Sequence, residues 1–164
     1  MNKMKTIFRL MVLFFFVAGF TSCNDDEEVV IEPTLEVNFA NIAGTWYLSE
    51  WNGTKLDDSR YFYITFNRKA VDGKRTYEIY QNFDSATSRH ITGSFDLEHD
   101  EDWGDIISGE YDYWMGEWSS SYIITELRSD SMIWTVKEDT GDISVYTRCA
   151  EVPADIIAGT RAIQ

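Results

Sequence analysis

Positive charge is scarce in this sequence. Its 164 residues include 14 lysines and arginines against 28 aspartates and glutamates, which gives a formal net charge of −14. Proteins that bind nucleic acid need basic patches to displace the counterions of the phosphate backbone. The composition therefore predicts no nucleic-acid partner, and it favours solubility and an affinity for cationic partners or metal ions.

Residue patterns that carry catalysis are missing as well. The sequence has no Gly-x-Ser-x-Gly elbow, no phosphate-cradling Gly-rich loop and no His-Glu-x-x-His pair. Its two histidines, His90 and His99, fall on separate parts of an expected strand and loop, where surface positions are favoured over a metal site. We therefore expect no enzymatic activity, no cofactor and no metal centre.

A dense group of carboxylates leaves one alternative open. Asp100, Asp102 and Asp105 fall in an expected hairpin loop and could supply the converging oxygens that calcium prefers. Their spacing does not fit an EF-hand, so a solvated acidic loop is the favoured interpretation.

The N-terminus has the three parts of a signal peptide. Three basic residues precede an uncharged apolar run over 10–20, and the small residues Thr21 and Ser22 follow directly before Cys23. The run of 11 residues is too short for a transmembrane helix, which takes about 20 apolar residues. We interpret residues 1–22 as a signal peptide that is removed on export.

A cysteine directly after small residues resembles the lipobox of bacterial lipoproteins, although Phe20 stands where leucine is most common. The resemblance implies cleavage before Cys23 and acylation of its thiol by two or three fatty chains such as palmitate, which would anchor the protein permanently. Cys149 would then be unpaired, so no intrachain disulfide would stabilise the domain. The alternative is a free cysteine at the end of an ordinary signal.

The segment 23–38 is expected to be a lipidated, extended tether. Asn24 is followed by four acidic residues, and the stretch to Asn38 shows no helical periodicity. An acidic run behind an acylated cysteine resembles the signal that directs lipoproteins of some Gram-negative lineages to the outer face of the outer membrane. The resemblance implies an outer-membrane lipoprotein at the cell surface. A plain solvated linker, with the protein on the periplasmic face, is the alternative.

Residues 39–152 have the pattern of one all-β domain, followed by a C-terminal tail over 153–164. Phe62, Ile64 and Phe66 alternate with residues of the opposite face, which predicts a strand with one face in the core. Short connections favour an antiparallel meander, and eight strands hide their edges best by closing into an up-and-down barrel. A β-sandwich is the alternative. The predicted strands are Gly44–Trp51, Arg60–Asn67, Arg75–Asn82, Arg89–Leu97, Asp105–Tyr111, Ser119–Leu127, Ser131–Lys137 and Ile143–Ala150.

The segment Gly44-Thr45-Trp46 resembles the Gly-x-Trp signature of lipocalins, eight-stranded barrels whose open mouth receives small apolar molecules. The resemblance implies that Gly44 and Trp46 lie at the closed end and that Arg148 from the last strand covers the Trp46 ring in a cation–π contact. Together with the lipobox and the tether, residues 40–153 look like the lipocalin-like domains of short bacterial lipoproteins.

Large aromatic residues are unusually dense in the segment 111–118. Exposed rings interleaved with acidic residues suit an apolar ligand at a barrel mouth, or a sugar stacked on tryptophan. We therefore predict a small hydrophobic or amphipathic ligand, or a glycan. The alternative is that these rings extend two strands and cap a filled barrel, which would act as an accessory protein through its surface. The predicted ligand-binding residues are Trp103, Tyr111, Tyr113, Trp114 and Trp118.

Overall fold

The computed structural model describes residues 32–113 and 115–159. The predicted signal peptide, Cys23, most of the tether and Trp114 therefore lie outside the described residues. In the described part, no helix is long and apolar enough to cross a membrane.

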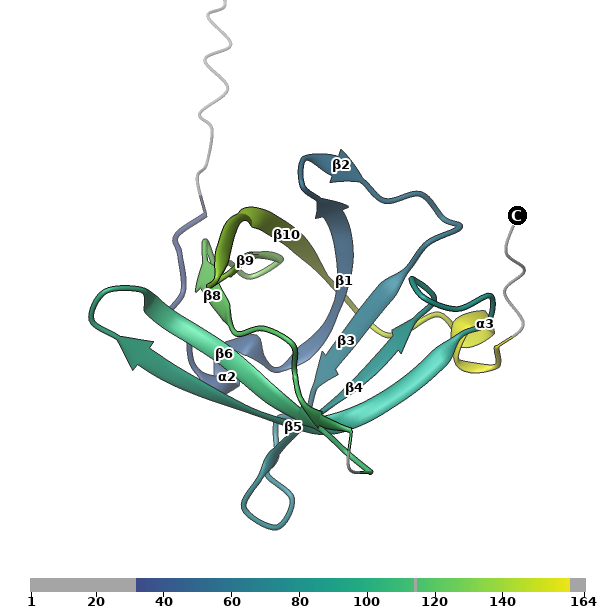
Figure 1. Ribbon diagram of the computed structural model, residues 1–164, viewed down its shortest axis with the longest axis horizontal. Coiled ribbons are helices and arrows are strands. Elements are labelled where there is room, and N and C mark those ends of the chain that lie inside the picture. The colour runs from purple at the N-terminus through teal and green to yellow at the C-terminus, as the bar shows by residue number, and fades with distance from the viewer. Residues whose placement is uncertain (1–31, 114, 160–164) are drawn as a thin grey trace, which may run out of the picture. The chain divides into compact units, whose positions relative to one another are not determined.

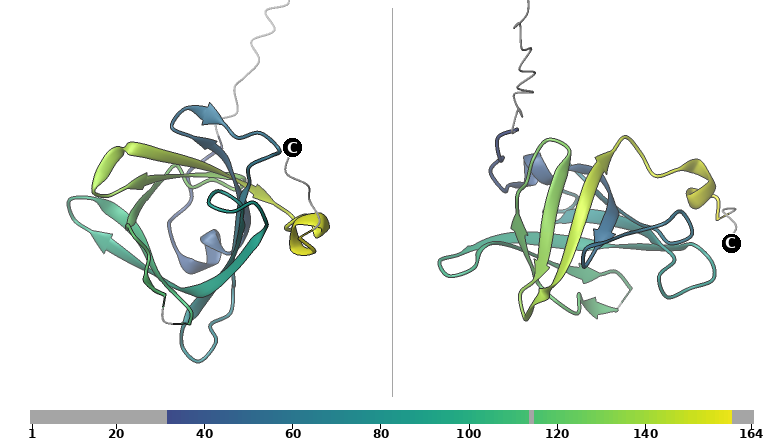
Figure 2. Two further views of the ribbon diagram at one scale, coloured as in Figure 1. Left: turned by 45° about the vertical axis from the view of Figure 1, so that its right-hand side comes forward. Right: turned by 90° about the horizontal axis from the view of Figure 1, so that it is seen from above.

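Eight antiparallel strands close into a barrel, as predicted, and the alternative of a β-sandwich is wrong (Figures 1 and 2). Each strand pairs with its neighbour along the chain, and the last strand returns to pair with the first, Trp46 facing Arg148 across the closing ladder. The barrel strands are β1 (Gly44–Trp51), β3 (Phe62–Phe66), β4 (Arg75–Gln81), β5 (Arg89–Asp100), β6 (Gly104–Tyr111), β8 (Tyr122–Thr125), β9 (Ser131–Val136) and β10 (Asp139–Cys149).

Four short elements complete the domain. Strand β2 (Thr54–Lys55) pairs with the end of β1, and β7 (Gly116–Glu117) pairs with the end of β6. Helix α2 (Phe39–Ile42) precedes the first strand. Helix α3 (Ala154–Ile157) follows the last strand and buries Ile156 in a cluster with Tyr61 and Val152, so the predicted C-terminal tail begins as part of the packed domain.

The ladders of the barrel differ in length. Strands β5 and β6 pair at eight register positions, from Gly93↔Tyr111 to Asp100↔Gly104. Strands β6 and β8 pair at two, Ile106↔Ile123 and Ile107↔Tyr122. The ring is therefore thinnest between β6 and β8, where the chain has just passed through β7 and the segment 118–121.

Three strand boundaries differ from the prediction by three residues or more. Strand β5 runs on to Asp100 instead of Leu97, β8 begins at Tyr122 instead of Ser119, and β10 begins at Asp139 instead of Ile143. The predicted turn over 140–142 is part of β10, where the register shifts between Asp139 and Ile143. Such a shift marks a β-bulge, which takes up extra residues within a strand, so a glycine-containing run need not end it.

One end of the barrel is closed by α2 and by the residues that resemble the lipocalin signature. The Trp46 side chain is fully buried, and its indole Nε1 donates to the Ile42 carbonyl at 2.8 Å. The guanidinium carbon of Arg148 lies 3.9 Å from the centroid of the Trp46 ring. Gly44 has a φ of +124°, and a Cβ there would come within 2.6 Å of the Arg148 guanidinium. The structure thus brings Gly44, Trp46 and Arg148 together.

Candidate functional site

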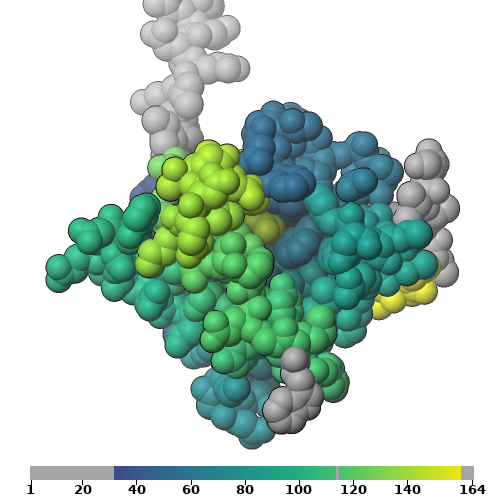
Figure 3. All heavy atoms as spheres, viewed as in Figure 1, coloured from purple at the N-terminus to yellow at the C-terminus, as the bar shows by residue number. Residues whose placement is uncertain are grey.

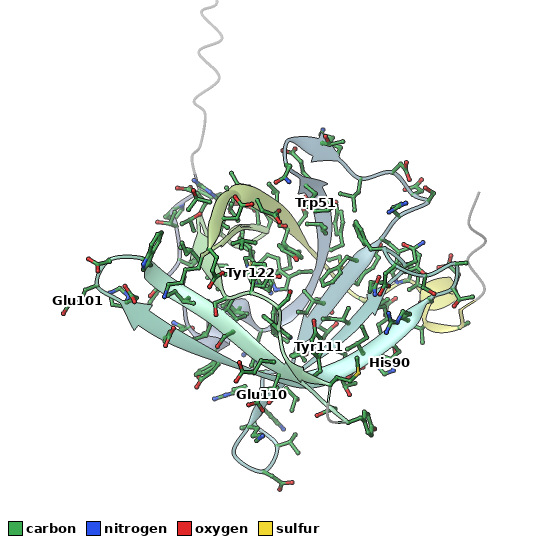
Figure 4. All side chains as sticks on the ribbon, viewed as in Figure 1. Trp51, His90, Glu101, Glu110, Tyr111 and Tyr122 are labelled. Atoms are coloured by element: carbon green, nitrogen blue, oxygen red, sulfur yellow. The ribbon has the colours of Figure 1, made fainter. Side chains whose placement is uncertain are left out.

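The other end of the barrel opens into a hollow of about 300 Å³. It lies where β1 and β4 end and where β3 and β5 begin, since Trp51, Phe62 and Gln81 all line it. Figure 3 shows the surface hollowed between the blue atoms of β1 and the green atoms of β8. Figure 4 shows Trp51, Tyr111 and Tyr122 reaching this region from three different strands. We call this hollow the mouth cavity.

Aromatic rings supply most of the wall of the mouth cavity. Its aliphatic members are Leu48, Ile64, Ile79 and Ile91, and its polar members are Gln81, Asp142 and Ser144. A concave, mainly apolar pocket with a few polar groups is the usual form of a small-molecule site, and this cavity lies at the small end of that range. The aromatic members are Trp51, Phe62, Phe83, Tyr111, Trp118, Tyr122, Trp134 and Tyr146.

A layer of rings crosses the barrel beside the cavity. The ring centroids of Tyr77 and Trp118 are 5.2 Å apart, those of Trp118 and Trp134 are 6.0 Å apart, and those of Trp134 and Tyr146 are 4.7 Å apart. Such spacings are favourable for aromatic pairs. Because Trp118, Trp134 and Tyr146 also line the cavity, this aromatic layer joins the core to the site.

Two glycines give these rings their space. A Cβ at Gly109 would lie 2.5 Å from the Trp118 ring, and one at Gly93 would lie 2.5 Å from the Tyr77 hydroxyl oxygen. The Trp118 indole donates to that hydroxyl at 2.7 Å, and the hydroxyl donates to the Glu110 carbonyl at 3.1 Å. Because Gly93 and Gly109 have no side chain, β5 and β6 leave room for Tyr77 and Trp118 at these two positions.

The rim of the cavity is held by polar contacts. Trp51 packs edge-on against Phe83, with ring centroids 5.9 Å apart, and its indole donates to Asp142 Oδ1 at 2.6 Å. Gln81 accepts from the Phe83 backbone N–H at 2.6 Å and donates to Asp84 at 2.7 Å. These contacts fix the rim although the Trp51 side chain is 45% exposed.

The tyrosines around the cavity are neutral at physiological pH. Burial raises the pKa of Tyr146, Tyr122 and Tyr111 above the usual value for a phenol. Burial also raises the pKa of Tyr77, in the aromatic layer, to about 12. Each phenol thus keeps its proton and can act as an uncharged hydrogen-bond donor.

One donor in the layer has no acceptor. The Trp134 side chain is 3% exposed, and within the described residues its indole Nε1 has no hydrogen-bond partner. A buried polar group without a partner costs about 1–3 kcal/mol, so few proteins retain one without a reason.

The structure separates the five residues predicted to bind ligand. Tyr111 and Trp118 line the mouth cavity. Tyr113 lies on the turn between β6 and β7 with 85% of its side chain exposed, and it does not line the cavity. Trp114 lies outside the described residues.

Trp103, also predicted to bind ligand, does not line the mouth cavity. Trp103 lies on the turn between β5 and β6, whereas Tyr111 ends β6 at its other extremity. Figure 4 shows Glu101, on the same turn, at the tip of a hairpin that points away from Tyr111.

Most of the cavity residues were missed at the sequence level. Trp51, Phe83, Tyr122 and Tyr146 carry no motif, and they meet only when the barrel closes. Their signal is alternation: Phe62 was predicted to share one strand face with Ile64 and Phe66, and inward residues near a strand's open end become cavity wall.

A second hollow of about 630 Å³ is more polar than the mouth cavity. It is lined by charged residues that include Lys74 and Glu110, whose charged atoms lie 3.8 Å apart. Trp118 lines both hollows. Four serines also contribute to its wall, Ser94, Ser108, Ser120 and Ser121.

The acidic hairpin has its own local contacts. Asp100 accepts from the backbone N–H groups of Asp102 and Trp103, at 2.9 and 3.0 Å, which holds the pKa of its carboxyl below the usual range. His99 Nδ1 lies 2.8 Å from an Asp105 oxygen. Across the described ranges, no group of three or more His, Cys, Asp or Glu side chains could hold a metal ion.

A model of the lipocalin-like domain family matches residues 42–134. This span is more than half of the chain and runs from α2 into β9. The chain belongs to the lipocalin-like domain family. The match ends before β10. The structure shows that β10, which carries Arg148, closes this lipocalin-like barrel by pairing with β1. No curated protein matches the sequence.

Proposed function

We propose that this protein is a membrane-anchored lipocalin-like lipoprotein that binds a small hydrophobic or amphipathic molecule in its mouth cavity. The observation that carries the proposal is an open hollow of about 300 Å³ whose wall is mainly aromatic. A barrel of eight strands can be filled by its own side chains or can hold one small ligand, and the open hollow favours the second case. The family supports a binding role in general.

The decisive experiment is native mass spectrometry on the exported protein, purified without detergent from its own host. We expect a stoichiometric small molecule, which extraction with organic solvent would identify by class. Ile91→Trp places a larger side chain in the cavity and should release the molecule. Ile133→Trp alters a residue of β9 that does not line the cavity, so this variant should retain the molecule. A protein that stays free of ligand after exposure to neutral, cationic and anionic lipids and to bile acids would contradict the proposal.

Anchoring at the outer membrane, on the cell surface, is the second part of the proposal, and it rests on the sequence around Cys23. Two fatty chains are enough for stable membrane association. Cys23→Ser should move the protein from the membrane fraction to the soluble fraction and abolish labelling by palmitate. The chain offers a matched control, because Cys149 is the other cysteine and Cys149→Ser should leave both results unchanged. Equal behaviour of the two variants would contradict lipidation at Cys23.

The second hollow favours one other candidate function, recognition of a glycan or partner protein at the surface. Serine hydroxyls and paired charges beside the Trp118 ring suit a hydroxyl-rich ligand. A glycan array probes this candidate directly. Ser120→Leu should abolish any binding seen, while Ile91→Trp in the mouth cavity should leave it unchanged.

A further inference from the structure

The wall of the mouth cavity carries a negative charge and no positive charge among the described residues. No lysine, arginine or histidine of the described residues lines it. Its one carboxylate is Asp142, which the bulge at the start of β10 places beside the opening. Asp142 is half-buried and accepts from the Trp51 indole, so it lies against the ring most exposed at the rim.

The arginines nearest the rim are already engaged. Arg89 begins β5 and pairs with Asp84, which also accepts from the cavity residue Gln81. Arg60 donates to the Phe83 carbonyl at 3.4 Å. An anionic ligand would therefore meet no cationic side chain in the wall of the mouth cavity among the described residues, and Arg89 beside it is already paired with Asp84.

The faces of the rings do not favour an anion either. The faces of tryptophan and tyrosine rings are negative, so they attract cations and repel carboxylates. The cavity tyrosines stay neutral, and their hydroxyls can bind an uncharged polar head group. The whole chain adds to this preference through its net charge of −14.

We propose that the mouth cavity selects its ligand by charge, accepting neutral or cationic molecules with a flat apolar body and rejecting carboxylates such as fatty acids. This inference rests on the proposed function, because it names the class of ligand for the same cavity. Asp142 is the residue that favours the cation, and the aromatic wall holds the apolar body.

Three compounds with one ring system test the proposal: 1-naphthylmethanol, 1-naphthylmethylammonium and 1-naphthoate. Isothermal titration at neutral pH should show the alcohol and the ammonium compound binding about fivefold more tightly than the carboxylate, since one nearby charge at a partly solvated rim is worth about 1 kcal/mol. Asp142→Asn keeps an acceptor for the Trp51 indole and removes the charge. It should lower the affinity for the ammonium compound to that for the alcohol.

A matched control separates Asp142 from the charge of the whole protein. Glu138 is exposed in the same hairpin and does not line the cavity, so Glu138→Gln removes one charge nearby and should leave the ranking unchanged. Equal shifts in the two variants would overturn the role of Asp142. Binding of the carboxylate as tightly as the alcohol would overturn charge selection while leaving the binding cavity intact. Failure of all three compounds to bind would instead overturn the cavity as a ligand site, and the proposed function with it.

Discussion

The two ends of the barrel differ in the burial of their tryptophans and in the hydrogen bonding of their polar groups. At the closed end the Trp46 side chain is fully buried, and Arg148 donates to the carbonyls of Asn41, Ala43 and Ser129 at 2.6–2.7 Å. At the open end Trp51 is 45% exposed, and near it the Trp134 indole has no hydrogen-bond partner within the described residues. Polar groups are satisfied at the closed end, whereas at the open end one buried donor is left available to a ligand. The comparison indicates that the closed end contributes stability through its satisfied polar contacts, whereas the open end is the part suited to binding.

The largest expected effect is on stability, from Arg148→Ala. The variant removes the contact with the Trp46 ring and leaves three carbonyls without their donor, which should lower the free energy of unfolding by about 2–4 kcal/mol. Calorimetry should show a lower Tm, and titration with 1-naphthylmethanol should show an unchanged affinity. Arg148→Lys should recover part of the loss, because an ammonium keeps the charge but not the planar fork. An unchanged Tm would show that Arg148 does not stabilise the closed end.

A substitution in the aromatic layer should affect both properties. Gly109→Val puts carbon atoms where the Trp118 ring lies, so the ring must move and the free energy of unfolding should fall by about 1–3 kcal/mol. Because Trp118 lines the cavity, affinity for 1-naphthylmethanol should fall too. Ser108→Val is the control on the preceding residue of β6, which does not line the mouth cavity, and it should leave affinity unchanged.

A substitution at the rim should affect binding with little change in stability. Trp51→Ala should weaken the binding of 1-naphthylmethanol about tenfold and change the free energy of unfolding by about 1 kcal/mol or less. Trp103 provides a matched control, because it is 43% exposed against 45% for Trp51 and it lies on the turn between β5 and β6, outside the wall of the mouth cavity. Trp103→Ala should leave affinity unchanged. Equal losses from the two variants would contradict the division between the ends.

The smallest effect concerns alkaline pH. The pKa of Tyr77 is raised from 10.0 to about 12, so the folded state holds this proton more tightly than the unfolded state. Stability from Tyr77 is therefore complete below pH 10 and is lost as the pH rises toward about 12. Urea titrations across this window should show a steeper fall in stability for the unaltered protein than for Tyr77→Phe. Identical slopes would show that Tyr77 does not contribute to the pH dependence.

The sequence predicted the barrel better than the site, for a physical reason. Strand and turn propensities are local, so all eight barrel strands were predicted and β1 was predicted with its observed bounds. The residues Gly44, Trp46 and Arg148 could be grouped because a short motif and the last strand mark them. The cavity depends instead on which strand ends meet. Trp51 and Ser144 face each other across the ladder that closes the barrel, and no local pattern encodes that pairing.

The ladder between β6 and β8 gives the barrel a seam. Two register positions join these strands, against eight between β5 and β6, and the ring of Trp118 packs over β6 beside that stretch. Backbone amides open first where few hydrogen bonds and little packing hold them. Amide exchange should therefore spread from this seam while the region around Trp46 is still protected. We therefore expect local opening along this seam to leave the closed end intact.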